Sequence, residues 1–292
     1  MRKKNILFAT ITILLISSFF CGCDLKLDTE TVADNDAVSY ELLNRITMEK
    51  TCANLAVYTT DSSAGKEYTG SGVIIKSVKE EVGVLIKSTG YTFYFLTNNH
   101  VVCGGKNGLK YKVVDYLERT FTAQFIMCSA SHDLALLKFS VEESDLVLNR
   151  DNINMVITPS VIDFADNSEM EKGDIVFTVG QPHKQRNAIT VGKFLNKKKV
   201  GHSDNIYSMV DFEVLLTDAY TTNGSSGGMM LNTDLNLIGV VFGGIFSSET
   251  KKFESSCAIP IERVNEFIDY CGLALDKNNS VDKSEETTGK VA

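Results

Sequence analysis

The chain has 292 residues, of which 43% are hydrophobic and 23% are charged, a composition typical of a globular protein and not of a disordered or collagen-like chain. A chain of this length can bury roughly 75% of its unfolded surface, so its core needs no disulfide framework. The formal charge is −8, and it is −11 from residue 23 onward, because residues 1–22 hold three basic side chains and no acidic one. A body this acidic excludes nucleic acid as an expected partner, since Lys and Arg supply most of the affinity for phosphates.

The N-terminus predicts an export signal. Basic residues 2–4 precede an apolar run at residues 6–20, which is short for a membrane span but fits the core of a signal peptide. The run ends in Phe20-Cys21-Gly22-Cys23, which resembles the lipobox of bacterial lipoproteins. The resemblance implies that residues 1–22 are removed and that Cys23 carries the lipid, which would anchor the protein to the cell membrane outside the cytoplasm. Plain secretion after cleavage near Cys21 or Cys23 remains the alternative.

The remaining cysteines and the histidines predict neither a disulfide framework nor a metal site. An odd number of cysteines without regular spacing allows at most two bridges, so most thiols are expected to be free. The four histidines are scattered and no C-x-x-C pair occurs, so metal-ligand spacing is absent and no cofactor is expected. The five cysteines after Cys23 are Cys52, Cys103, Cys128, Cys257 and Cys271.

Composition divides the rest of the chain into three parts. Residues 23–45 are acidic and polar, which predicts a tether, and residues 46–275 form the expected folded domain. Residues 276–292 have almost no apolar content and predict a disordered tail.

Short β-branched and aromatic runs in the folded domain favour an all-β sandwich or barrel. These runs lie at residues 72–76, 81–86, 92–97, 112–114, 121–127, 134–139, 174–179, 189–195, 207–210 and 237–242. A single helix is predicted after Pro260, with Gly272 as its C-terminal cap. Its apolar face is formed by Ile261, Val264, Phe267 and Ile268.

The segment Thr217–Gly228, TDAYTTNGSSGG, places Ser226 among glycines. Such a serine suits a nucleophile, because glycine lets the backbone turn sharply and a substrate approach closely. The string Gly224–Gly228 also satisfies the G-x-S-x-G elbow of α/β-hydrolases. That fold places its catalytic His after the Ser, whereas the last histidine here is His202, so it is excluded.

Two upstream segments supply a histidine and an acid. Phe95–Val102 places His100 just after an apolar strand, and Ser131–Leu137 places Asp133 at the start of another. Together with the Ser226 segment, in the order His, Asp, Ser, they resemble the signature blocks of chymotrypsin-fold serine proteases, closest to the Deg/HtrA-type branch. The likeness covers roughly residues 53–270. Supporting blocks lie at Gly70–Ile74, Gly173–Pro182, Leu237–Val241 and Ala258–Pro260.

The resemblance implies two antiparallel six-stranded β-barrels, a C-terminal helix and a catalytic cleft between the barrels. It assigns Ser226 as the nucleophile, His100 as the general base and then acid, and Asp133 as the residue that orients the imidazole. A serine hydroxyl needs such a base near neutral pH, and a carboxylate stabilises the imidazolium that forms. The backbone N–H groups of Gly224 and Ser226 would stabilise the oxyanion. Proteins or peptides are therefore the expected substrates.

The resemblance also suggests a substrate preference. Tyr220, six residues before the nucleophile, would lie at the base of the pocket, with Val241 and Phe242 on its wall. None of these side chains supplies a charge, and a buried unpaired cation is costly. A shallow apolar pocket for Val, Ala, Ile or Leu is expected.

The chain departs from the family pattern at Asn223 and Met229, which replace proline and affect loop rigidity more than chemistry. Ser225 cannot form the ion pair with a new N-terminus that activates the digestive proteases, so activation by cleavage in that manner is not expected. It leaves no room for a PDZ module after the last helix, so neither an oligomeric cage nor PDZ-regulated activation is assumed. One alternative stays open: a catalytically inactive protease-like lipoprotein that binds peptides or partners. A solute-binding lipoprotein would need an α/β architecture with many helices, which the pattern does not predict.

Overall fold

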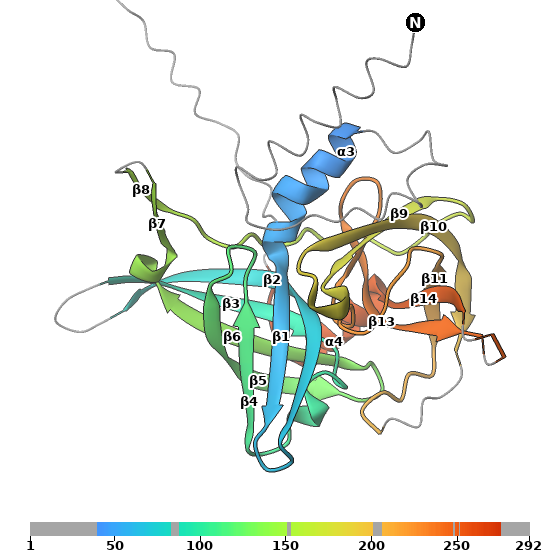
Figure 1. Ribbon diagram of the computed structural model, residues 1–292, viewed down its shortest axis with the longest axis horizontal. Coiled ribbons are helices and arrows are strands. Elements are labelled where there is room, and N and C mark those ends of the chain that lie inside the picture. Colours follow the sequence, from blue (N-terminus) through green and yellow to red (C-terminus); the bar gives the residue numbers. More distant parts are fainter. Residues whose placement is uncertain are drawn as a thin grey trace, which may run out of the picture.

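The computed structural model describes residues 40–82, 88–150, 153–200, 206–247, 249–250 and 252–275. Two closed barrels of six antiparallel strands lie side by side and are followed by a C-terminal helix (Figure 1). This confirms the expected fold. The expected signal peptide, Cys23 and the C-terminal tail lie outside the described residues. Over the described residues, no helix is both long and apolar enough to cross a membrane.

The N-terminal barrel has an aromatic core. Its six strands follow the order β1-β2-β3-β6-β5-β4 around the barrel. They are β1 (Asn54–Asp61), β2 (Lys66–Val82), β3 (Ser88–Thr97), β4 (Leu109–Val114), β5 (Thr120–Ser129) and β6 (Leu134–Glu142). The ring of Phe139 stacks against Phe93 and Phe121, with centroids 5.1 and 5.0 Å apart. Buried aromatic pairs of this kind add to the stability gained from burial of their area.

The core of the C-terminal barrel is mainly aliphatic, with Phe194 among Val, Leu, Ile, Ala and Met side chains. Its strands follow the order β10-β11-β14-β13-β12-β9. They are β9 (Ile175–Gly180), β10 (Ala188–Lys199), β11 (Glu213–Thr217), β12 (Met229–Leu231), β13 (Leu237–Phe246) and β14 (Phe253–Pro260). The register between β13 and β14 shifts between Val241 and Gly243, so Phe242 lies at a bulge. Bulges bend a strand and redirect the side chains beside them.

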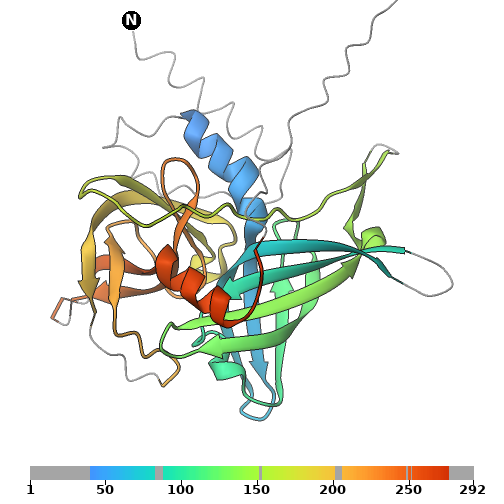
Figure 2. The same cartoon turned by 180° about the vertical axis from the view of Figure 1, so that it is seen from behind.

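A third apolar cluster joins the two barrels. Val73 and Leu134 of the first barrel pack in it with Phe177 and Val240 of the second. Helix α4 (Ile261–Tyr270) covers the junction from behind (Figure 2). Its predicted apolar face, Ile261, Val264, Phe267 and Ile268, is buried, which confirms that helix.

The structure differs from the expectations at several elements. Residues 40–45, expected in the tether, form helix α3 (Tyr40–Arg45), which continues as a π-helical turn whose Ile46 is buried in the junction. The run at residues 207–210 is not a strand, because this segment instead crosses to the first barrel, where Met209 N donates to Ala130 O. The sequence runs also miss β1, β11, β12, β14 and the hairpin formed by β7 (Val147–Arg150) and β8 (Ile153–Val156). The five cysteines of the described chain are free thiols.

Candidate active site

His100 and Asp133 form a hydrogen-bonded pair at one edge of the N-terminal barrel. His100 follows β3 and Asp133 precedes β6, and these strands are paired so that Thr97 faces Ala135. The His100 Nδ1 atom lies 2.7 Å from Asp133 Oδ2, and His100 N donates to Asp133 Oδ1 at 3.0 Å. The carboxylate is completely buried and both its oxygens contact His100. The sheet register therefore brings the predicted base and acid together.

The pair fixes which nitrogen of His100 carries the proton. A carboxylate only accepts hydrogen bonds, so Nδ1 donates to Asp133 and Nε2 of the neutral ring keeps its lone pair. Asn98 holds the acid in place from the backbone side, since its Nδ2 donates to Asp133 O at 2.8 Å. The ring is thus oriented with a basic nitrogen turned away from the acid.

Ser226 lies in the turn between β11 and β12, packed against the N-terminal barrel. Ser71 N donates to Ser226 O at 2.7 Å. A Cβ on Gly70 would lie 2.6 Å from a methyl carbon of Val101 and 2.9 Å from Ser226 O. The loop of His100 and the turn of Ser226 therefore meet at Gly70, where only glycine fits.

The structure distinguishes the two adjacent serines. Ser226 is partly exposed and its Oγ donates to Phe242 O at 3.4 Å. Ser225 is buried, and its Oγ accepts from Thr222 N within the turn. Among the hydrogen bonds of the described residues, none joins Ser226 Oγ to His100. The Ser226 hydroxyl is thus accessible, whereas the Ser225 hydroxyl is buried and hydrogen-bonded within the turn.

The turn also presents two backbone donors. Asn223 O accepts from His183 N at 2.8 Å. The peptide between Asn223 and Gly224 is trans, so the Gly224 N–H points away from His183. Gly224 has a φ of +101°, a conformation that other residues rarely adopt. Within the described chain, neither Gly224 N nor Ser226 N donates to another protein group, so both can donate to a ligand.

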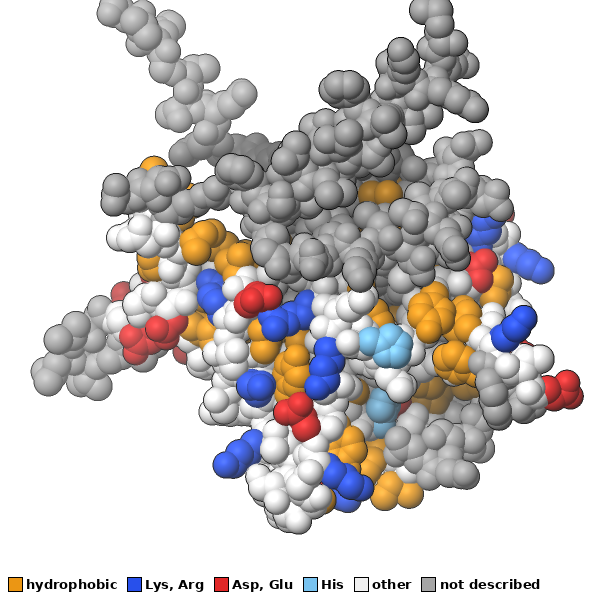
Figure 3. Space-filling view, viewed as in Figure 1, with side chains coloured by type: hydrophobic (Ala, Val, Ile, Leu, Met, Phe, Trp, Pro, Cys, Tyr) orange, Lys and Arg blue, Asp and Glu red, His pale blue; other side chains and the backbone are white. Residues whose placement is uncertain are grey.

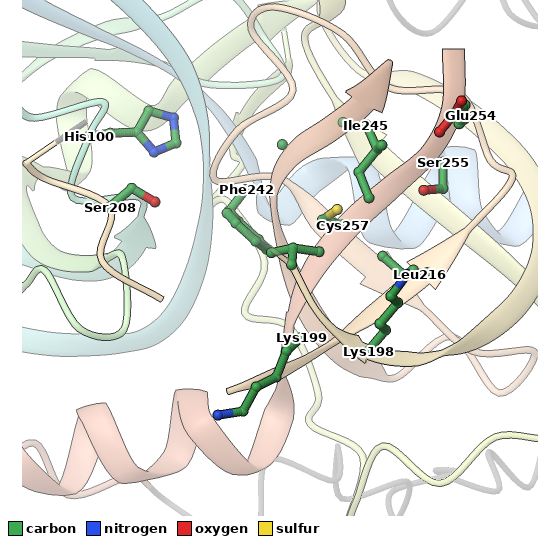
Figure 4. A pocket seen from close by; sticks show the side chains of 13 residues that line it. His100, Lys198, Lys199, Ser208, Leu216, Phe242, Ile245, Glu254, Ser255 and Cys257 are labelled. Carbon is green, nitrogen blue, oxygen red and sulfur yellow. The ribbon is translucent and has the colours of Figure 1, made fainter. Parts of the chain in front are cut away.

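A cavity of about 730 Å³ lies beside His100. Figure 4 shows His100 at one side of it and Ile245 and Glu254 at the other, with Phe242 between. On the face shown in Figure 3, histidine side chains lie between the two barrels next to apolar surface. The cavity therefore spans the junction between the barrels.

The structure separates the three residues expected around the substrate pocket. Phe242 lines the cavity, whereas Val241 is buried in the core of the C-terminal barrel. Tyr220 is 37% exposed and contacts the ring of Phe253 edge-on at 5.0 Å. It does not line the cavity that holds His100 and Phe242.

Two thiols near His100 are poor alternative nucleophiles. Cys257 lines the cavity, and burial raises the pKa of its thiol to about 12. Cys103 lies near the His100 carbonyl, with a sulfur–oxygen distance of 3.9 Å, and burial raises its pKa as well. Thiols react as thiolates, so both stay unreactive near neutral pH. Over the described residues, no group of three or more His, Cys, Asp or Glu side chains is arranged to hold a metal ion.

Residues 81–240 match the trypsin-like peptidase domain family, which covers more than half of the chain and includes His100, Asp133 and Ser226. The chain belongs to the trypsin-like peptidase family. The chain is similar to two proteins of Bacillus subtilis (strain 168). It is 29% identical over 203 residues to serine protease Do-like HtrB, a match that covers 69% of this chain and 39% of the relative. It is also 29% identical over 194 residues to serine protease Do-like HtrA, covering 64% of this chain and 37% of the relative.

A protein of Rickettsia prowazekii (strain Madrid E), named as a DegP-like periplasmic serine endoprotease, is 28% identical over 165 residues, covering 56% of this chain and 28% of the relative. The chain thus spans less than two fifths of the length of these relatives. Among solved structures, HtrA-type protease AlgW with tripeptide matches with a TM-score of 0.57 and 23% identity, covering 78% of this chain and 62% of that chain. That likeness supports the fold alone. The family model is that of a trypsin-like peptidase domain, and the relatives are named as serine proteases.

Sequence reasoning missed the residues that hold the site together. Asn98, Ser71 and Gln181 all lie inside matched blocks, yet no role was assigned to them. Their side-chain contacts are with backbone groups of distant residues, such as Gly224 and Gly70. A sequence pattern does not reveal such contacts, although the G-S-G and G-Q-P strings indicated the two segments that contain Ser71 and Gln181.

Proposed function

We propose that this chain is an extracytoplasmic serine endopeptidase in which Ser226, His100 and Asp133 form the catalytic triad. The observation that carries the proposal is the buried His100–Asp133 hydrogen bond, at 2.7 Å, beside the turn that exposes Ser226. Proteins or peptides are the substrates that such a site would hydrolyse.

The proposed reaction uses the described groups in two steps. Ser226 Oγ attacks the substrate carbonyl while His100 Nε2 takes its proton, and the Gly224 and Ser226 N–H groups stabilise the oxyanion. The intermediate collapses to an acyl-enzyme and the amine leaves with the proton from His100. Water then attacks the ester in the same way and releases the acid and free Ser226. Asp133 keeps its charge throughout and stabilises the imidazolium.

The proposal requires the Ser226 hydroxyl to rotate from Phe242 O towards His100. The bond to Phe242 O is long, at 3.4 Å, so little stability opposes this rotation. Catalytic hydrogen bonds often tighten only when substrate binds. The substrate carbonyl would then occupy the space in front of Gly224 N and Ser226 N.

Labelling with a fluorophosphonate probe tests the proposed function. Wild-type protein should be labelled on Ser226, and Ser226→Ala should abolish labelling and lower kcat on the order of 10⁶-fold. Ser225→Ala is the matched control, because Ser225 is buried, and it should keep measurable activity. A wild-type protein that binds peptides without labelling would support the inactive binding protein instead. Labelling that survives in Ser226→Ala would place the nucleophile elsewhere.

We further propose that Cys23 carries a lipid that anchors the protein to the outer side of the cell membrane. The basic, apolar and cysteine-containing N-terminal sequence supports this, as does the periplasmic location named for one relative. Wild-type protein should partition with membranes, and Cys23→Ser should release it or leave its precursor unprocessed. Cys21→Ser is the control and should leave partitioning unchanged. Wild-type protein that washes off membranes under mild conditions would contradict the anchor.

The proposed substrate pocket is apolar and takes Val, Ala, Ile or Leu before the cleaved bond. Phe242, which lines the cavity beside His100, is apolar, whereas Val241 is buried in the core and the uncharged ring of Tyr220 packs on Phe253 outside that cavity. A small apolar pocket discriminates only weakly between substrate side chains of similar size.

A further inference from the structure

Ser71 connects the two barrels at the turn of Ser226. It lies on β2 of the N-terminal barrel, and its side chain is completely buried. Its Oγ donates to Gly224 O at 2.8 Å and accepts from Gln181 N at 2.9 Å. Both partners belong to the C-terminal half of the chain. One hydroxyl therefore bridges a strand of the first barrel and two loops of the second.

The backbone of Ser71 reinforces this bridge. Ser71 N donates to Ser226 O at 2.7 Å, and Ser71 O accepts from the Thr97 hydroxyl at 2.7 Å. Thr97 ends β3, three residues before His100. Every polar group of Ser71 is thus occupied, and its bonds run from the end of β3, just before His100, to the turn that carries Ser226.

These bonds fix the orientation of one backbone donor, the Ser226 N–H. Ser71 holds the carbonyls of Gly224 and Ser226, while Gly228 N donates to Ser225 O at 2.9 Å. Three consecutive peptide planes are therefore held by hydrogen bonds at their carbonyl oxygens. A peptide plane fixed at its oxygen is also fixed at its N–H. Since the Ser226 N–H belongs to the middle plane, it cannot rotate without breaking one of these bonds.

We propose that Ser71 is a positioning residue that keeps the Ser226 N–H group directed at the substrate carbonyl oxygen. The inference rests on the proposed function, because it assigns Ser71 to the oxyanion step of that reaction. Ser71 never touches the reacting atoms and acts through the turn. Oxyanion donors stabilise the transition state more than the bound substrate, so loss of their alignment lowers kcat rather than raising KM.

The chemistry of the site requires a hydroxyl. A serine hydroxyl donates one hydrogen bond and accepts others, whereas alanine would leave Gly224 O and Gln181 N buried without Ser71 as a partner. The surroundings are also tight, since a Cβ on Gly180 would lie 3.0 Å from Ser71 Oγ. Cysteine is the nearest replacement and offers only a weak donor and a weak acceptor.

Ser71→Ala tests this inference against Thr59→Val. Thr59 is a matched control, because its hydroxyl is buried in the same barrel and has no hydrogen-bond partner in the described chain. Active sites are first counted by complete fluorophosphonate labelling, and kcat is expressed per labelled site. Ser71→Ala should lower kcat by about tenfold to a hundredfold with KM changed less than about threefold, and should weaken binding of a peptide boronate by a similar factor. Ser71→Cys should recover part of the loss, and Thr59→Val should match the wild type.

An unchanged kcat per labelled site in Ser71→Ala would overturn the inference. So would a loss confined to the number of labelled sites and to the thermal midpoint, because that pattern indicates a purely structural residue. A labelled wild type with either result overturns only the role of Ser71. A wild type that neither labels nor hydrolyses peptides overturns the proposed function, and this inference with it.

Discussion

The two barrels contribute different kinds of groups to the candidate site. The N-terminal barrel supplies side chains, His100 and Asp133, held by a short hydrogen bond at the ends of paired strands. The C-terminal barrel supplies the Ser226 hydroxyl on a turn whose Gly224 and Ser226 N–H groups have no protein partner in the described chain, so most of its contribution is made by the backbone. Side-chain chemistry depends on residue identity, whereas backbone chemistry depends on conformation. The two halves of the site should therefore respond differently to substitution.

The largest expected effect among the following tests concerns the side chains of the N-terminal barrel. Asp133→Asn should lower kcat near neutral pH by about 10⁴-fold, because an amide that donates to Nδ1 forces the proton onto Nε2. Asp218→Asn is the control, since the Asp218 side chain accepts from Lys193 N and the amide oxygen of Asn can still do so. It should cost less than about tenfold. Peptide hydrolysis per labelled site measures both, and equal losses would contradict the assignment of Asp133.

The side-chain half of the site could be predicted from the sequence. His100 and Asp133 each lie beside an apolar strand in a recognisable block, and the structure brings them together as the resemblance implied. Residue identity carries that information. The role of Asn98 could not be predicted in the same way, because its amide donates to the backbone carbonyl of Asp133. Every residue type has such a carbonyl, so the sequence does not indicate the contact.

An intermediate effect is expected from the backbone of the C-terminal barrel. Gly224→Ala should lower kcat/KM by about 10²- to 10³-fold, because its φ of +101° disfavours other residues and a Cβ would clash with Gln181 O. Gly173→Ala is a matched control, with the same φ of +101° but no atom within 4 Å of the added Cβ. It should cost about 1–3 kcal/mol of stability and leave kcat/KM unchanged. Similar losses of kcat/KM in both variants would show that strain, not donor geometry, is responsible.

The backbone half could be predicted only in part. The glycines around Ser226 marked the turn, but not the direction of its N–H groups, which depends on partners such as His183 N and Ser71 Oγ. The bulge that places Phe242 in the cavity left no signal in the apolar run at residues 237–242. Strand β14 was missed as well, because its serines are polar residues buried by hydrogen bonds, as Ser256 Oγ is to Ala219 O. The N–H directions, the bulge and strand β14 all depend on contacts between residues far apart in the sequence. A local sequence pattern does not predict such contacts.

The C-terminal barrel can select its substrate either by the shape of the cavity or by its charge. If the C-terminal barrel selects by shape, the exposed carboxylate of Glu254, which lines the cavity, should have no effect on selectivity. If it selects by charge, that carboxylate would favour basic side chains, as an acidic pocket residue does. Phe242 bears on selection by shape, because its ring lies in the cavity and occupies volume that a large substrate side chain would need (Figure 4).

The smallest expected effect is therefore a preference among apolar residues in a peptide library. Cleavage should dominate after Val, Ala, Ile and Leu, with differences of roughly 10- to 200-fold at most, because one methylene contributes about 1–3 kcal/mol in such a pocket. Phe242→Ala should enlarge the pocket and raise cleavage after Phe relative to Ala by about tenfold, while Glu254→Gln should leave the profile unchanged. Dominant cleavage after Arg, Lys, Glu or Asp would refute the apolar pocket. A preference for Arg and Lys that disappears in Glu254→Gln would show that charge, not shape, selects the substrate in the C-terminal barrel.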